Sequence, residues 1–150
     1  MLRVTKLADY GIVILTHLAA HRENTYNARD IANLVNLPLP VVSKVLKLLG
    51  KSGLVTSQRG IKGGYGLAYA PEKITVAAII RAVEGPIAVT ECNANRDCEL
   101  EMRCPVRTNW HLINRTIQSA LERISLAEMT RPISQPLVGL TVPGGSVPGN

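Results

Sequence analysis

The residues best suited to chemistry are the chain's three cysteines, Cys92, Cys98 and Cys104, with five residues between neighbours. An odd number of cysteines in one short stretch does not fit the disulfide framework of a secreted domain. Thiolates on an irregular loop can converge on one metal centre, and these spacers exceed the about two to four residues that separate zinc-ligand pairs. The spacing therefore favours an iron–sulfur cluster, and a zinc site remains open.

Three thiolates leave one position of such a centre to a further ligand. A weak or oxygen ligand there would make the site labile, which suits a sensor better than an electron carrier. Pro105 is predicted to start a helix directly after Cys104, so that the helix dipole would stabilise a thiolate. The fourth-ligand candidates near the cysteines or in a partner subunit are His111, Glu91, Glu99, Glu101 and Asp9.

The residues before the cysteines are predicted to form helices and a hairpin. Apolar residues recur at helical spacing in three segments, with Thr5 and Asn27 as N-caps and Pro40 in the first turn of the third helix. Two short strand-like runs then flank a glycine-rich turn. The expected helices cover 5–21, 28–35 and 40–51, and the expected strands cover 54–57 and 65–69.

This order of elements is that of a winged helix-turn-helix, and its exposed polar residues fit DNA. The third helix has an apolar stripe, and its other face carries donors that can reach bases or phosphates. The hairpin tip is basic and rich in glycine, so its backbone can approach a phosphate closely. The predicted DNA contacts are Ser43, Lys44 and Lys47 on the helix and Arg59, Gly60 and Lys62 on the hairpin.

The rest of the chain is predicted to be helical apart from the cysteine segment and the end. Thr75 can cap a helix that ends at Glu84, a long helix follows Pro105, and Ser125 opens a capping box. The fold class is mainly α with a small β-hairpin, a winged helix-turn-helix domain followed by a long dimerisation helix. We expect a DNA-binding domain over 1–85, a cluster-binding loop over 86–104, a dimerisation helix with a short cap over 105–130, and a disordered tail over 131–150.

Composition and charge agree with a regulator that binds nucleic acid. Aromatic residues make up 3% of the chain and Phe is absent, which favours an aliphatic, helical core. The net charge is +6, and residues 1–62 hold nine basic side chains against three acidic ones, as phosphate binding requires. No signal peptide or membrane span is predicted, so we expect a cytoplasmic protein. No catalytic constellation stands out, and we expect neither an enzyme nor a small-molecule substrate.

Several motifs together resemble one family of regulators. These are Leu7-Ala8-Asp9-Tyr10-Gly11, the wing from Arg59 to Ala68, the segment Val76–Gly85, and the spacing of the cysteines. They are similar to the Rrf-type winged-helix repressors, which include IscR-like and NsrR-like iron–sulfur regulators. Thr90-Glu91-Cys92 and Cys104-Pro105-Val106-Arg107 resemble most closely the branch that regulates the SUF system of iron–sulfur assembly. The resemblance covers residues 1 to about 130.

The resemblance implies a homodimer that binds a double-stranded DNA operator and represses a SUF-type operon, its own included, while it holds a cluster. IscR-like members have a histidine three residues after the last cysteine, where this chain has Arg107. The nitric-oxide-sensing branch instead uses an aspartate of the partner's first helix, and Asp9 occupies that position. This implies Asp9 as fourth ligand and a 4Fe–4S rather than a 2Fe–2S cluster. A nitric-oxide-responsive repressor, or a regulator with zinc or no metal, is the alternative.

Overall fold

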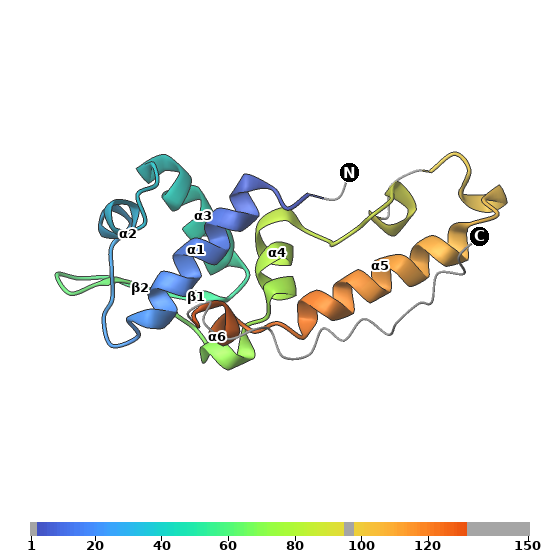
Figure 1. Cartoon of the computed structure of the whole chain (residues 1–150). Coiled ribbons are helices and arrows are strands. Elements are labelled where there is room, and N and C mark those ends of the chain that lie inside the picture. The colour runs from blue at the N-terminus through green and yellow to red at the C-terminus, as the bar shows by residue number, and fades with distance from the viewer. Residues whose placement is uncertain (1–2, 95–97, 132–150) are drawn as a thin grey trace, which may run out of the picture.

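The structure, a computed structural model, describes residues 3–94 and 98–131. The predicted tail lies outside these residues apart from Arg131. A winged head and a projecting helical arm make up the described part (Figure 1). The helices are α1 (Lys6–Ala20), α2 (Ala28–Leu34), α3 (Leu39–Lys51), α4 (Val76–Glu84), α5 (Arg107–Glu122) and α6 (Leu126–Met129). The strands are β1 (Val55–Gln58) and β2 (Gly64–Leu67), and short 3-10 turns are η1 (Pro71–Lys73), η2 (Glu91–Ala94) and η3 (Glu101–Arg103).

Side-chain caps start the helices of the head where the sequence predicts them. A capping oxygen satisfies one of the N–H groups that the first helical turn leaves without a partner. In α3 a proline in the first turn serves instead, because its missing N–H is not needed there. The caps are Thr5, Asn27 and Thr75, which accept hydrogen bonds from the N–H groups of Ala8, Asp30 and Ala78 at 3.2, 2.9 and 3.1 Å.

The core of the head lies between α1, α3 and α4, and it is aliphatic. Val42, Val45, Leu46 and Leu49 of α3 are buried, which confirms the predicted stripe. The short helix α6 comes back from the far end of the chain and adds Leu126, which is fully buried. Other buried members of the core are Ile14, Leu15, Leu18, Ile31, Ile74, Ile79 and Val83.

The hairpin and the return of the chain complete the head. Strands β1 and β2 pair antiparallel, with Val55 opposite Leu67 and Gln58 opposite Gly64. Both strands are shifted by about one residue from their predicted positions. Ser125 forms the predicted capping box with Glu128, and a backbone bridge between Thr75 and Ser125 joins α6 to the start of α4.

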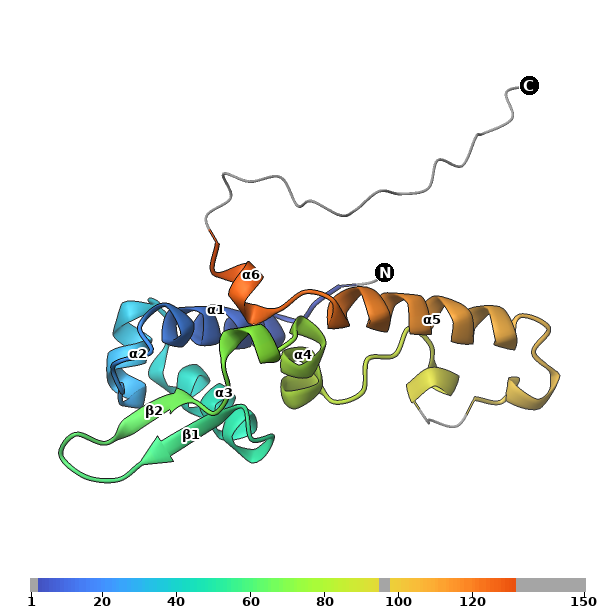
Figure 2. The ribbon, with the colours of Figure 1, turned by 90° about the horizontal axis from the view of Figure 1, so that it is seen from below.

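The arm consists of α5 and the segment that holds the cysteines. Figure 2 shows α5 leaving the head, with the segment from α4 to η2 running beside it toward its outer end. Helix α5 begins at Arg107, not at Pro105, because Pro105 and Val106 form a non-helical turn before it.

Among residues 3–94 and 98–131, no single helix is long and apolar enough to cross a membrane. Only α2 and α3 taken together, bent by 117° at their junction, have the length and composition of a possible span.

Candidate metal centre and nucleic-acid interface

The outward face of α3 carries the predicted DNA contacts. Ser43, Lys44 and Lys47 are all exposed, whereas the opposite face of the helix lies in the core. A helix held this way presents its polar face as a rigid surface, as insertion into a major groove requires.

The tip of the hairpin brings the other predicted contacts together. Arg59, Gly60 and Lys62 are exposed between the two strands, and Gly60 has a φ of +121°, which favours glycine. Ile61 lies between them with its side chain fully exposed. Ile61 was not among the predicted contacts, although an apolar residue between basic residues at a turn is a sequence signal for a wedge into a minor groove.

The hairpin is attached to the loop between α1 and α2. The Tyr26 N–H donates to Tyr65 O at 3.3 Å, and the Tyr65 N–H donates to Tyr26 O at 2.7 Å. Thr25 Oγ1 also donates to Lys62 O at 3.0 Å. A Cβ atom at Gly64 would lie 2.7 Å from the Tyr26 backbone, so only glycine fits this close approach.

Two histidines pack beside this attachment. The ring of His17 lies 4.6 Å from that of His21 and 5.3 Å from that of Tyr26, measured between centroids. The Nε2 atom of His17 is buried without a hydrogen-bond partner. Burial lowers the pKa of His17 below its ordinary value, and the nearby His21 lowers it further.

The three cysteines lie on the arm, half-buried and as free thiols. Cys92 is in η2, where its Sγ lies 3.1 Å from Thr90 Oγ1, and Cys104 ends η3. Cys104 is three residues before the first residue of α5, so it does not lie at the helix N-terminus as predicted. Among residues 3–94 and 98–131, no three His, Cys, Asp or Glu side chains are gathered closely enough to hold a metal ion.

The donor set itself fits an iron–sulfur cluster. Thiolates are the ligands that such clusters take, and none of these three is engaged in a disulfide. The residues between them form short 3-10 turns and irregular backbone, not long helices, in the part that is described. Such a loop can change conformation without breaking regular structure.

The fourth-ligand candidates occupy different places. Asp9 is exposed in the first turn of α1, on the head. His111 is half-buried on α5 and lines a shallow pocket of about 300 Å³ together with Cys92. This juxtaposition could not be read from the sequence spacing. The pocket is lined by Cys92, Asn93, His111, Asn114, Arg115 and Gln118.

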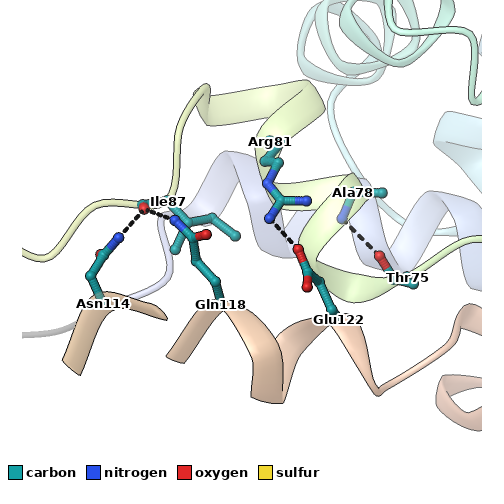
Figure 3. Close-up of polar contacts among 7 residues, drawn as sticks. All are labelled: Thr75, Ala78, Arg81, Ile87, Asn114, Gln118 and Glu122. Carbon is teal, nitrogen blue, oxygen red and sulfur yellow. Dashed lines mark hydrogen bonds and ion pairs between the residues drawn. The ribbon is translucent and has the colours of Figure 1, made fainter. Parts of the chain in front are cut away.

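Two carboxamides of α5 bind the segment that leads to Cys92. Asn114 and Gln118 reach the backbone around Ile87, as Figure 3 shows. Neither residue was among the predicted site residues. The available signal was the spacing of Asn114, Gln118 and Glu122, one helical turn apart on the same face of α5.

Helix α5 buries little of its own apolar surface. Its apolar residues recur every three or four positions, which confirms the predicted periodicity. Yet Asn114 is the only residue of α5 that is buried within the described chain. We call Trp110 and Ile113 of α5, together with Val106 just before the helix, the α5 stripe, and their exposed fractions are 36, 41 and 45%.

Proteins of similar sequence are transcriptional regulators. The family model Rrf2, described as iron-dependent transcriptional regulator, matches residues 4–132. The HTH-type transcriptional regulator IscR of Aliivibrio salmonicida is 31% identical over 129 residues, covering 85% of this chain and 77% of the relative.

Solved structures show the same fold. CymR, the global cysteine regulator of B. subtilis, superposes with a TM-score of 0.72 at 31% identity, covering 87% of this chain and 97% of CymR. IscR of T. potens gives a TM-score of 0.67 at 31% identity and covers 85% of each chain. The mainly α winged-helix fold with its hairpin is thereby confirmed, and the relatives are regulators, not enzymes. The chain belongs to the Rrf2 family of iron-dependent transcriptional regulators.

Proposed function

We propose that this chain is a transcriptional repressor controlled by an iron–sulfur cluster on Cys92, Cys98 and Cys104. The observation that carries the proposal is the placement of three free thiols on one segment, between α4 of the DNA-binding head and α5 of the arm. The segment that holds these thiols connects the head to the start of α5. A ligand that binds all three thiols would therefore act on this connection.

In the proposed mechanism, this segment is ordered when the cluster is bound and becomes disordered when the cluster is lost. When bound, the cluster joins the three thiolates to one centre and makes their arrangement depend on iron supply and on oxidants. Ligation of Cys92, Cys98 and Cys104 to one centre would constrain their positions relative to one another and so change the conformation of the segment. That change would reset the position of the head relative to α5.

We further propose Asp9 of the partner subunit as the fourth ligand and a 4Fe–4S cluster. Asp9 is exposed and thus accessible to a second chain. His111, which shares a pocket with Cys92, is the competing ligand within the chain. Replacing each by alanine decides between them, because loss of the true ligand changes the absorption and electron paramagnetic resonance spectra of the cluster and the other substitution does not.

A homodimer is the proposed assembly, formed through the α5 stripe. The stripe holds a tryptophan and branched aliphatic residues at helical spacing, and each of them remains 36–45% exposed within the described residues. A second copy of α5 offers the same apolar surface, and an isologous dimer would place two heads on two half-sites of one operator. The contacts proposed for each half-site are Ser43, Lys44, Lys47, Arg59, Gly60 and Lys62.

The proposed target is the chain's own SUF-type assembly operon, repressed by the cluster-loaded form. The test is a comparison of wild type with Cys98→Ala after anaerobic reconstitution of both. We expect iron and sulfide binding and tight binding to the upstream DNA of that operon in wild type, and weak binding of both in the variant. Equal DNA affinity of the two proteins would overturn the proposal.

A regulator with zinc or without metal is the second candidate. It is favoured by the likeness to CymR, a global cysteine regulator. A colourless anaerobic preparation with stoichiometric zinc would support it over the cluster. A cluster that is lost on nitric oxide addition, with release of DNA, would instead assign the signal to nitric oxide.

A further inference from the structure

We propose that Asn114 and Gln118 form a carboxamide clasp that couples the cysteine segment to the DNA-binding head. The clasp consists of these two side chains and the backbone groups of Ile87 and Val89 that they bind. The inference rests on the proposed function, because it names the residues through which the state of the cysteines would reach the head.

The clasp holds the segment after α4 by both ends of a carboxamide. Asn114 Oδ1 accepts from the Val89 N–H at 3.0 Å, and Asn114 Nδ2 donates to Ile87 O at 3.2 Å. Gln118 Nε2 donates to the same Ile87 O at 2.8 Å (Figure 3). The backbone here is neither helix nor strand, so these side chains supply the partners that a regular element would supply.

Burial makes these contacts specific. Asn114 is 7% exposed, and among the described residues it is the one polar residue that is buried. A buried polar group is stable only when it is hydrogen-bonded, and a carboxamide can serve a donor and an acceptor from one position. An apolar side chain at 114 would fill the space but leave the Val89 N–H without its partner.

On the cysteine side, polar contacts continue from the clasp to a thiol. Thr90, next to Val89, places its Oγ1 3.1 Å from Cys92 Sγ. Asn93 Nδ2 donates to Thr90 Oγ1 at 2.7 Å and also lies 3.4 Å from Trp110 O on α5. A movement of Cys92 is therefore passed to residues 87–90, which the clasp holds.

On the head side, the next turn of α5 continues the same line of contacts. Glu122 forms an ion pair with Arg81 of α4 at 2.5 Å, in sequence with Asn114 and Gln118 on one face of α5. Glu84, the last residue of α4, in turn accepts a hydrogen bond from Thr5, the N-cap of α1. The line thus runs from Cys92 through residues 87–90 and α5 to α4 and α1.

A clasp that only stabilises the fold would behave differently from one that couples. Its loss would weaken DNA binding equally with and without the cluster. Loss of a coupling residue would instead change the ratio of the two DNA affinities, since coupling is the difference between the two states.

The experiment measures that ratio for full-length wild type, Asn114→Ala and Gln118→Ala. The probe is a duplex selected from a random-sequence pool by reconstituted wild-type protein, titrated with cluster-loaded and cluster-free protein under anaerobic conditions. Coupling commonly amounts to about 5- to 150-fold, and we expect Asn114→Ala to bring the ratio to about one with unchanged iron content. Gln118→Ala removes one contact of three, and we expect it to lower the ratio less.

Thr116→Ala is the matched control. Thr116 is exposed on α5 and its Oγ1 donates to Leu112 O within the helix, so we expect the wild-type ratio. If the wild-type ratio is well above one and both clasp variants keep it, the coupling role of the clasp is overturned and the proposed function is not. A wild-type ratio of one would overturn the proposed function, and the clasp with it.

Discussion

The exposed lysines of α3 are the residues from which the proposed DNA contact can be measured most directly. A lysine that neutralises a phosphate releases counterions, so its contribution depends on salt concentration. A lysine that contacts a base changes the preference for one sequence over another. The two roles are therefore separable at a single position.

Lys47→Ala is expected to weaken binding to selected and random duplexes alike, as loss of a phosphate contact would. The slope of log K against log salt concentration should become less steep by about one. Fluorescence anisotropy at several salt concentrations measures both. Lys73→Ala, which removes the same charge from the exposed turn η1, is the control. Equal slopes for the two variants would contradict a specific role of Lys47.

His17 is expected to make the fold less stable in mild acid. Its pKa is lowered in the folded chain, chiefly by burial, so the unfolded chain binds a proton more readily. Its effect on the free energy of unfolding is absent above the ordinary pKa of 6.5 and grows as the pH falls toward the folded-state pKa. The free energy of unfolding in urea should decrease between about pH 7.5 and about pH 5.5, and this decrease should be smaller for His17→Gln than for wild type. An equal loss would show that the protonation of His17 does not matter.

Single residues also show how far the sequence could predict the candidate site. The exposure of Ser43, Lys44 and Lys47 follows from helical periodicity, which is local. Helical spacing places Asn114 and Gln118 on one face of α5, but their partners are backbone groups about 25 residues away in a segment without periodicity, which the spacing does not identify. The placement of His111 and Cys92 along one pocket has the same non-local origin.

The element whose attachment matters most for DNA binding is the hairpin. Two strands of four residues each are too short to be stable alone. The hairpin is held by the two backbone hydrogen bonds between Tyr26 and Tyr65, which depend on the absence of a side chain at Gly64.

Gly64→Ala is expected to push the hairpin away from Tyr26. The added methyl would lie 2.7 Å from backbone atoms, and overpacking of this kind costs about 1–3 kcal/mol. We expect a lower free energy of unfolding in urea and weaker DNA binding. Gly66→Ala is the control, because a Cβ there meets no atom within 4 Å. Equal losses from both substitutions would show that the attachment to Tyr26 is not the cause.

At the same scale, the helices of the head were predictable because caps and apolar periodicity are encoded within each segment. Helix α5 begins two residues later than predicted, because Pro105 is compatible with a turn as well as with a first helical turn. The contribution of Leu126 to the core of the head could not be predicted from its own segment. It depends on α5 returning the chain to α4, which is a property of the whole fold.

Residues 3–94 and 98–131 form a head and an arm, and one side of the arm is apolar and partly exposed within this described part. Helix α5 has 16 residues and spans about 24 Å, long enough for a helix pair to bury a continuous stripe. In the proposed dimer the cysteine segment would therefore lie beside the helix that joins the two copies.

Ile113→Asp is expected to convert the proposed dimer into a monomer. It places a charge in the α5 stripe, where burial of an unpaired carboxylate is unfavourable. Sedimentation velocity should show half the mass of wild type, and the matched control Leu112→Asp, 65% exposed and off the stripe, should stay dimeric. A monomer holds one head, so its affinity for a two-half-site duplex should fall toward its affinity for a single half-site, because the linked second binding event is lost. A variant that stays dimeric would place the interface elsewhere than on α5.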